Sequence, residues 1–285
     1  MNCENTVSAR EQVNQPAAAP SVTALKQIRR MHGGSQSHLM LCSDGHRYIV
    51  KYQNNPQHSR ILINEFLGTR LATLLRLPTA PIAKVHVSEE LVRSTYELHM
   101  ENPRGNIPCR PGLHFGSRYV GDSRATIFDS LPDNALMEVK NLSDFIGMLV
   151  FDKWTCNVDA RQTIFCSDRQ SGSAGYRAVM IDQGFCFSGS DWDFPDLPLR
   201  GLYCRNKVYC QVTGGGSFEP WLEGLNREMT PERITQIVRE TPAEWCPDSS
   251  QLLILAEKLY QRRKRVFELL SAARKSSRDP FPHWL

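Results

Sequence analysis

A chain of 285 residues is long enough to bury a substantial core, as one large domain or two smaller ones. Its formal net charge of +4 is small for this length and does not by itself indicate a nucleic-acid partner. The nine cysteines show no repeated C-x-x-C spacing, and no apolar run approaches the roughly 20 residues of a membrane helix. With no signal peptide evident, these features predict a cytoplasmic protein with free thiols and no membrane partner.

Residues 1–21 have no hydrophobic periodicity and are expected to form a disordered tail. Alternating apolar and polar residues over 38–42 and 46–52 then predict a β-hairpin with a tight turn between the strands. Helical spacing predicts a helix over about 59–75, and a further strand is expected over 82–87.

Residues 101–113 are rich in Pro and Gly and are expected to be an irregular insertion, and 115–121 a short strand running into a connecting turn. Ser143 is expected to cap a helix whose apolar stripe covers 145–154.

The pattern after this helix predicts a strand pair over 163–166 and 178–181, separated by a polar loop. Thr230 and Pro231 are typical of a helix start, and apolar residues over 252–270 predict one long C-terminal helix.

Two loops carry aspartates next to these apolar elements. Asp159 lies in the loop 157–162, and Asp182 lies 23 positions later, which leaves room for one hairpin that brings both carboxylates to one cleft wall. Phosphoryl transfer needs one carboxylate to accept the proton of the attacking hydroxyl and another to hold Mg²⁺ on a nucleotide. Arg161 could steady the transferred charge, and Asn157 is a candidate metal ligand. The alternative is an ordinary turn, because Asn and Asp favour loops on their own account.

A glycine-containing turn between two predicted strands is a candidate phosphate cradle, because glycines let consecutive backbone N–H groups approach phosphates. An ordinary surface turn is the alternative, since the G-x-G-x-x-G spacing is absent. The turn consists of Gly33, Gly34, Ser35, Gln36 and Ser37.

Lys51 ends an apolar strand, from which it could reach nucleotide phosphates, and Glu65 on the following helix could pair with it. Taken singly, Lys51 could equally be a lysine on an edge strand, and Glu65 a solvated glutamate on a helix. The ordered set of glycine turn, strand lysine and helix glutamate is more specific.

Together these residues resemble the HipA-like kinases, distant relatives of protein kinases and phosphoinositide lipid kinases. The resemblance covers roughly residues 28–221. It is carried by residues 31–37, 48–51, 64–65, 151–154, 157–159 and 181–185.

The resemblance implies an α+β, two-lobed protein-kinase-like fold. A small β-rich N-lobe over 22–117 would be joined through Tyr119 and Val120, at the nucleotide site, to a larger helical C-lobe over 118–285. It also implies ATP and Mg²⁺ as cofactors and a protein Ser/Thr hydroxyl as the acceptor.

Carried over by position, the resemblance makes Lys51 the residue that holds ATP phosphates and Glu65 its partner. Asp159 would be the base and Asp182 the metal ligand.

The chain departs from this family's pattern at the second metal ligand. The position five residues after Asp159 is Ile164 rather than Asn, and Gln162 is the nearest amide on a shorter loop. A catalytically weak or inactive nucleotide-binding pseudokinase, acting through protein contacts, is therefore the alternative. Nucleic-acid binding through the basic run 261–265 is the weakest hypothesis, because a solvated helix face explains the same charges.

Overall fold

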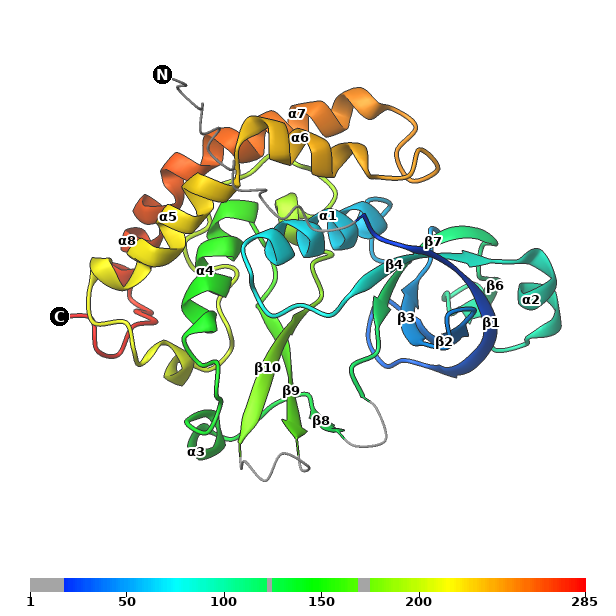
Figure 1. Cartoon of the computed structure of the whole chain (residues 1–285), viewed down its shortest axis with the longest axis horizontal. Helices are drawn as coiled ribbons and strands as arrows, with labels where there is room; N and C mark the ends of the chain where they lie inside the picture. Colours follow the sequence, from blue (N-terminus) through cyan, green and yellow to red (C-terminus); the bar gives the residue numbers. More distant parts are fainter. Residues whose placement is uncertain (1–17, 122–124, 169–174) are drawn as a thin grey trace, which may run out of the picture.

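The computed structural model describes residues 18–121, 125–168 and 175–285. The predicted tail therefore lies, up to residue 17, outside the described residues, and the first strand begins at Ser21. The chain starts with a five-stranded region and continues into a region made mainly of helices (Figure 1).

Five strands form a closed barrel in the order β1-β2-β3-β7-β4. They are β1 (Ser21–Arg30), β2 (His38–Cys42), β3 (Arg47–Lys51), β4 (Ile82–Val87) and β7 (Gly112–Arg118). Neighbours are antiparallel except β1 and β4, which close the barrel in parallel. Inward-pointing residues such as Val22 and Ala24 form a small apolar cluster inside it. The predicted hairpin and the strand over 82–87 are confirmed.

The stretch 101–113, predicted to be irregular, is partly ordered into strands. A short hairpin joins β5 (His99–Met100) to β6 (Ile107–Pro108), after the helix α2 (Glu89–Ser94). β7 then starts at Gly112, three residues before the predicted strand, because its edge pairs with β4 from Gly112 onward.

Helix α1 (Ile61–Leu74) lies between the barrel and the helical region (Figure 1). Twelve of its 14 residues are buried, so both sides of the helix are covered by protein. One side contacts β7 of the barrel, and another contacts α6 (Pro231–Arg239). This position lets polar side chains of α1 reach groups in both regions.

The predicted strand pair is confirmed and belongs to a three-stranded sheet, ordered β10-β9-β8. Its strands are β8 (Ala125–Phe128), β9 (Gln162–Asp168) and β10 (Tyr176–Ile181). The hairpin of β9 and β10 places residue Gln162 opposite Ile181, so the loops before β9 and after β10 meet at one end of the sheet.

The remaining helices pack around α4 and one large apolar core. They are α3 (Asp133–Leu136), α4 (Asp144–Thr155), α5 (Glu219–Glu228), α6, α7 (Ser249–Arg262) and α8 (Val266–Arg274). Helical turns of the 3-10 type are η1 (Cys186–Ser188), η2 (Asn206–Tyr209), η3 (Gly215–Phe218) and η4 (Arg263–Arg265).

Two predictions about these helices need correction. Ser143 precedes α4, but its backbone is already helical and its side chain makes no capping hydrogen bond. The long C-terminal helix is interrupted by η4, which separates α7 from α8 although the apolar spacing continues through it. Thr230, in contrast, caps α6 by accepting a hydrogen bond from the Arg233 N–H.

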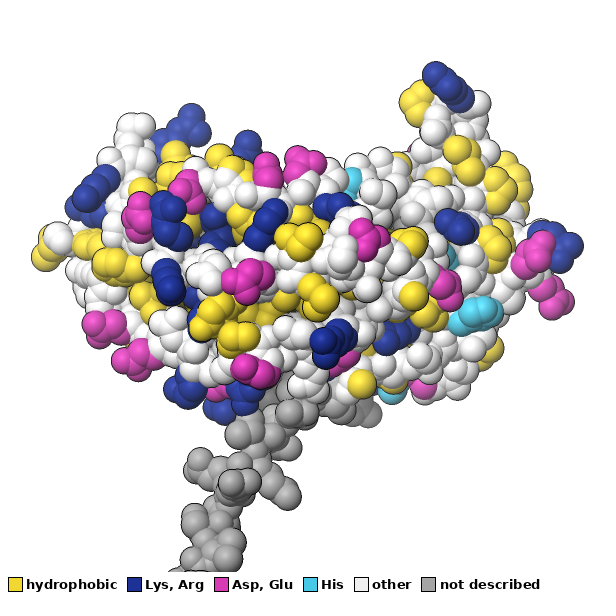
Figure 2. Space-filling model, turned by 90° about the horizontal axis from the view of Figure 1, so that it is seen from above, with side chains coloured by type: hydrophobic (Ala, Val, Ile, Leu, Met, Phe, Trp, Pro, Cys, Tyr) yellow, Lys and Arg dark blue, Asp and Glu magenta, His cyan; other side chains and the backbone are white. Residues whose placement is uncertain are grey.

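The face that carries α6 and α7 shows charges of both signs between apolar patches (Figure 2). Exposed apolar side chains on α7 and α8 include Leu253, Ile254 and Phe267. Within the described ranges, each helix is too short or too polar to cross a lipid bilayer.

Candidate functional site

Three of the predicted site residues meet in one buried ion-pair cluster. Lys51, the last residue of β3, forms an ion pair with Glu65 Oε1 on α1. Its Nζ also lies 3.0 Å from Asp182 Oδ1, in the loop after β10. The exposed fractions are 8% for the Lys51 side chain, 4% for Glu65 and 21% for Asp182. Lys51 and Asp182 are 131 positions apart in the chain, so the fold alone brings them together.

Lys51 and Asp182 hold each other in the ionised state, whereas burial raises the pKa of Glu65 to about 7. Burial by itself would raise the pKa of Asp182, but the Lys51 ammonium, the hydrogen bonds from Glu65 and Lys51, and the Arg161 charge together lower that pKa to about 2. Burial would lower the pKa of Lys51, yet the carboxylates of Glu65 and Asp182 raise it above its ordinary value. Asp182 is therefore an anion at neutral pH, with part of its side chain open to solvent.

The chain around Asp182 is held against α1. Asp182 has φ +58°, and the next N–H, of Gln183, donates a 3.0 Å hydrogen bond to Glu65 Oε2. Gly68 makes the close approach possible, because a Cβ there would lie 2.7 Å from the Gln183 Cβ. Glu65 thus contacts both Lys51 and the backbone that follows Asp182.

The loop that carries Asp159 is built on a second buried ion pair. Asp152, near the end of α4, accepts hydrogen bonds from Arg161 Nε at 2.8 Å and from Arg161 Nη2. Asn157 Nδ2 donates to the same carboxylate at 3.0 Å. Arg161 Nη1 reaches the Ile181 carbonyl at 2.8 Å, one residue before Asp182. This network ties the loop to α4 and to the end of β10.

Asp159 itself is half-buried, and its carboxylate makes local contacts. Its Oδ1 accepts a 2.8 Å hydrogen bond from the Ala160 N–H, and its Oδ2 lies 3.4 Å from Gln162 Nε2. Its carbonyl accepts a 2.9 Å hydrogen bond from the Gly201 N–H. The structure therefore places Gln162, an exposed residue, beside Asp159 at the start of β9.

The geometry corrects the expectations for Arg161 and Asn157. Arg161 is only 2% exposed, and its guanidinium is directed at Asp152 and the Ile181 carbonyl rather than at the open side of the loop. Asn157 is 3% exposed, its Nδ2 is bonded to Asp152, and its Oδ1 accepts from the Asp159 N–H. Both side chains are used to shape the loop, so neither is placed to steady a phosphoryl group or to bind a metal ion.

The glycine-containing turn joins β1 to β2 at the rim of the barrel. Gly33 has φ +113°, and both Gly33 and Gly34 are exposed. The side chain of Gln36 turns away, since its Oε1 accepts from the Glu101 N–H at 2.6 Å and its Nε2 donates to the Glu101 carbonyl at 3.0 Å. Ser35 is half-buried and Ser37 is buried. The exposed backbone of the glycines is thus the accessible part of this turn.

Tyr119 and Val120 follow β7 and are both half-buried. The Tyr119 N–H donates to the Arg47 carbonyl at 2.8 Å, and the Arg47 guanidinium lies 5.2 Å from the centre of the Tyr119 ring. The connection after the barrel is therefore fixed to β3, the strand that carries Lys51.

Three buried polar residues at this site had no predicted role, although they lie in stretches that carry the family resemblance. Asn64, Asp152 and Lys153 are almost fully buried inside α1 and α4. The signal was available, because polar side chains within apolar helical stretches are rarely buried without a partner. Asp152 and Lys153 interrupt the apolar stripe of α4, and Asn64 stands directly before Glu65.

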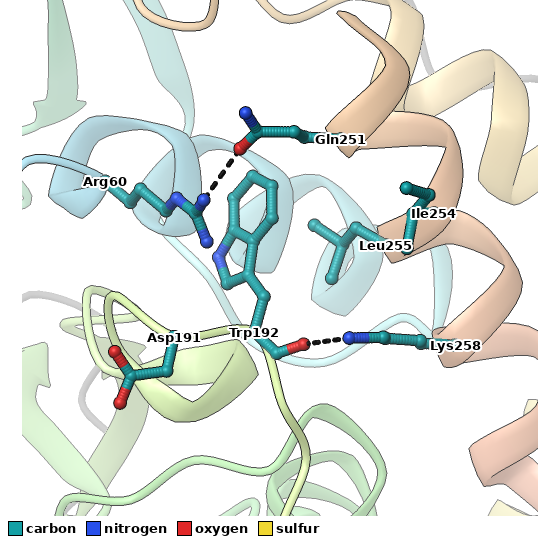
Figure 3. Close-up of a pocket in the computed structure, with 7 residues that line it drawn as sticks. All are labelled: Arg60, Asp191, Trp192, Gln251, Ile254, Leu255 and Lys258. Atoms are coloured by element: carbon teal, nitrogen blue, oxygen red, sulfur yellow. Dashed lines mark hydrogen bonds between the residues drawn. The ribbon is translucent and has the colours of Figure 1, made fainter. Parts of the chain in front are cut away.

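A separate pocket of about 260 Å³ lies between the start of α1, the chain after Asp182 and α7 (Figure 3). Its lining comprises Arg60, Asp191, Trp192, Gln251, Ile254, Leu255 and Lys258. None of the ion-pair residues and no part of the Asp159 loop lines it, so the pocket and the charged cluster are different places in the fold.

This site offers few protein carboxylates to a metal ion. Among the residues that the structure describes, no group of three or more His, Cys, Asp or Glu side chains could hold a metal ion. Mg²⁺ is commonly bound through one or two carboxylates together with nucleotide phosphates and waters. Asp182, which is ionised and partly exposed, fits that mode of binding.

Basic side chains of the run 261–265 form hydrogen bonds and ion pairs with other parts of the protein. Arg262 is buried and donates to the carbonyls of Lys153 at 3.0 Å and Phe194 at 2.8 Å. Arg265 forms ion pairs with Asp196 at 2.8 Å and with Glu268 at 2.7 Å. These contacts give the run a structural use and leave nucleic-acid binding without support from it.

The fold is similar to that of solved kinases. The Helicobacter pylori proinflammatory kinase CtkA superposes with a TM-score of 0.56 at 12% identity, over 88% of this chain and 99% of its own. The Golgi casein kinase superposes with a TM-score of 0.51 at 12% identity, over 93% of this chain and 76% of its own. A structure of that kinase with Mn/ADP bound gives 0.49 at 13% identity, over 91% and 75%. At such identities the likeness of the first two shows a kinase-like fold of mixed helices and strands.

Sequence comparison identifies the family. No curated protein matches the chain in sequence. The family model of the HipA-like kinases matches residues 25–171, which run from within β1 to the end of β9 and include Lys51, Glu65 and Asp159. This match covers more than half of the chain, and it agrees with the resemblance seen in the sequence. The protein belongs to the HipA-like kinase family.

Proposed function

We propose that this protein is an ATP- and Mg²⁺-dependent phosphotransferase that acts on a Ser or Thr hydroxyl of a protein. The observation that carries the proposal is the placement of Lys51 between Glu65 and Asp182, because the three residues come from a barrel strand, a central helix and a distant loop. Phosphoryl transfer needs a lysine that is held in position and an ionised carboxylate beside it.

The proposed architecture has two lobes with the nucleotide between them. The barrel and α1, within residues 22–117, form the N-lobe, and residues 118–285 form the C-lobe with both aspartate loops. Tyr119 and Val120 then join the lobes at the edge of the nucleotide site. The apolar cluster inside the barrel supports this division, and α1 joins the lobes because its apolar residues pack in the other cluster, around α4.

The nucleotide is held by residues of both lobes. The exposed glycine backbone between β1 and β2 approaches the phosphates, and Lys51 gives them a positive charge that Glu65 keeps in place. Asp182 is the principal metal ligand, and the exposed amide of Gln162 is the second candidate. When bound, MgATP supplies the phosphoryl group and neutralises its charge.

Asp159 is the proposed base for the acceptor hydroxyl. Its Oδ2 has only a long 3.4 Å contact with Gln162 Nε2, so this oxygen is available to accept a proton. Arg161 and Asn157 act indirectly, since their bonds to Asp152 and to the Asp159 N–H fix the shape of the loop. The protein substrate and any regulatory protein partner are recognised elsewhere on the surface.

A catalytically weak, nucleotide-binding pseudokinase is the second candidate. Ile164 pairs with Val179 inside the sheet, so an apolar side chain occupies the position where an Asn ligand is expected. The Gln162 amide nitrogen faces Asp159, which leaves one amide oxygen for a second metal contact. Loss of that contact would weaken transfer and spare nucleotide binding.

We also place the protein in the cytoplasm. All eight cysteines in the described residues are free, which suits a reducing compartment.

The mixed charge of the face in Figure 2 supports a protein partner rather than a nucleic-acid partner.

The first experiment incubates purified protein with γ-labelled ATP and Mg²⁺ or Mn²⁺, alongside Asp159→Asn. We expect label transfer by the parent protein and a loss of about 10²-fold or more in the variant, because general base catalysis contributes on that scale. ATP should raise the melting temperature of both proteins.

Equal transfer by parent and variant would contradict the role of Asp159. No transfer by either, with ATP still stabilising both, would favour the pseudokinase. Absence of both transfer and stabilisation would overturn nucleotide binding altogether.

A further inference from the structure

The side chain of Asn64 binds the chain that follows Asp182 through several hydrogen bonds. This residue of α1 is fully buried. Its Nδ2 donates to three carbonyls, those of Gly184 at 2.8 Å, Cys186 at 2.9 Å and Gly189 at 2.8 Å. One amide nitrogen therefore binds three backbone carbonyls of the segment that begins two residues after Asp182. Its two hydrogens are shared among these carbonyls.

The other half of the Asn64 amide is also occupied. Its Oδ1 accepts a 2.9 Å hydrogen bond from the indole N–H of Trp192. The indole can only donate and the carbonyls can only accept, so the partners themselves fix the orientation of the amide. A carboxylate at this position would face three carbonyl oxygens with no donor. An apolar side chain would remove all four bonds, although the Gly184 carbonyl would keep its 2.9 Å contact with His58 Nε2 and the Cys186 carbonyl its 3.1 Å bond from the Gly189 N–H.

Trp192 is itself held from two further sides (Figure 3). The Arg60 guanidinium lies 4.1 Å from its ring centre, and Lys258 Nζ on α7 donates to its carbonyl at 2.6 Å. Arg60 also donates to the Ser190 carbonyl at 2.8 Å and to Gln251 at 2.7 Å. The end of the segment is thus fixed to the start of α1 and to α7.

Helix α1 holds this segment at its beginning as well. Glu65, the residue next to Asn64, accepts from the Gln183 N–H at 3.0 Å while it pairs with Lys51. Adjacent residues of one helix therefore bind the backbone that directly follows Asp182.

We infer that Asn64 is a positioning residue, which holds residues 183–192 so that the Asp182 carboxylate points toward the metal-nucleotide site. This inference rests on the proposed function. Because the bonds are made by α1 and α7 within the chain, the segment is held in place without a partner or a modification.

The test compares Asn64→Asp and Trp192→Phe with the parent protein. Leu71→Ala is the matched control, because Leu71 is a fully buried residue of the same helix whose side chain makes no hydrogen bond. Two quantities are measured: amide hydrogen exchange of residues 183–192 without nucleotide, and the Mg²⁺ concentration that half-saturates nucleotide binding.

Asn64→Asp should speed exchange across residues 183–192 and raise the half-saturating Mg²⁺ concentration by about tenfold, as the loss of one or two net hydrogen bonds implies. Trp192→Phe removes a single donor and should raise that concentration by about threefold. Metal-free nucleotide affinity should stay unchanged in both. Leu71→Ala should lower the melting temperature without changing the Mg²⁺ dependence.

Unchanged Mg²⁺ dependence in Asn64→Asp, with the parent binding Mg²⁺-nucleotide, would overturn the positioning role alone. An equal change in Leu71→Ala would also overturn it, because general destabilisation would then explain the effect. If the parent showed no Mg²⁺-dependent nucleotide binding, the proposed function and this inference would both fail, while the exchange data would still report how the segment is held.

Discussion

The two aspartate segments differ in where their carboxylates find partners. The Asp182 carboxylate binds Lys51 on the barrel, whereas the Asp159 carboxylate binds the Ala160 N–H and faces Gln162 within its own loop. One aspartate depends on a contact between two regions of the molecule, and the other is set by local structure. A shift of the barrel would therefore change the surroundings of Asp182 and leave those of Asp159 intact.

The backbones of these two segments are nevertheless joined. The Val158 N–H donates to the Phe185 carbonyl at 3.1 Å, and Arg161 Nη1 donates to the Ile181 carbonyl at 2.8 Å. The loops keep a fixed relation to each other, while only Asp182 responds to the position of Lys51. This difference suits the proposed roles, in which Asp182 binds the metal of a nucleotide held by the barrel and Asp159 is a base that stays in place.

The largest expected effect on nucleotide binding separates the two carboxylates directly. Asp182→Asn should weaken Mg²⁺-dependent nucleotide binding by about 100-fold, because it removes the charge that is offered to the metal. Asp159→Asn should leave that binding nearly unchanged, since its carboxylate contacts only its own loop. Calorimetric titration of each variant with nucleotide, with and without Mg²⁺, measures this difference. Equal weakening in both would mean that the two carboxylates share one task.

The second effect concerns the ion pair beneath the Asp159 loop. Arg161→Met should lower the free energy of unfolding by about 3–5 kcal/mol, because it leaves the buried Asp152 carboxylate without its cation. Urea denaturation gives the value. The double variant Asp152→Asn with Arg161→Met removes both charges and should recover part of the loss. A change below about 1 kcal/mol in the single variant would show that the pair is not what fixes the loop.

The smallest expected effect is the pH dependence of stability that Lys153, near the Asp159 loop, contributes. Lys153 donates to the Arg200 carbonyl, next to the Gly201 N–H that binds Asp159, and burial lowers the pKa of Lys153 to about 8. The unfolded chain keeps this proton up to its ordinary pKa of 10.5, so the contribution of Lys153 to stability should rise with pH between about 8 and 10.5 and level off below 8.

Urea denaturation of the parent and of Lys153→Met at pH 8 and pH 9.5 measures this contribution. The comparison cancels the opposite effect of buried cysteines such as Cys42 and Cys109, whose raised pKa lowers stability over the same range. The Lys153 contribution should be about 1.5 kcal/mol between the two pH values, and Lys153→Met should remove that part of the change. Parallel curves for parent and variant would contradict it. Asp182, whose pKa lies near 2, contributes no pH dependence in this range.

The sequence by itself determined the local elements and their order. Alternation fixed the hairpin of β2 and β3 and the pairing of β9 with β10, and helical spacing placed α1, because these patterns report which face of one element is buried. The same patterns could not show that η4 breaks the last helix, since apolar spacing continues across it. Lys51, Glu65, Asp159 and Asp182 could be named as a set because each stands at the end or on the face of such an element.

Only the tertiary structure decided which polar side chains are available for chemistry. Arg161 and Asn157 look like site residues in the sequence, but the buried Asp152 takes up their donors. Asn64 lies in a stretch that carries the family resemblance, but only the fold shows that it binds partners 120 to 128 positions away. Hydrogen bonds and ion pairs depend on distance in space, so groups far apart in the chain determine whether a polar side chain is free or already bonded.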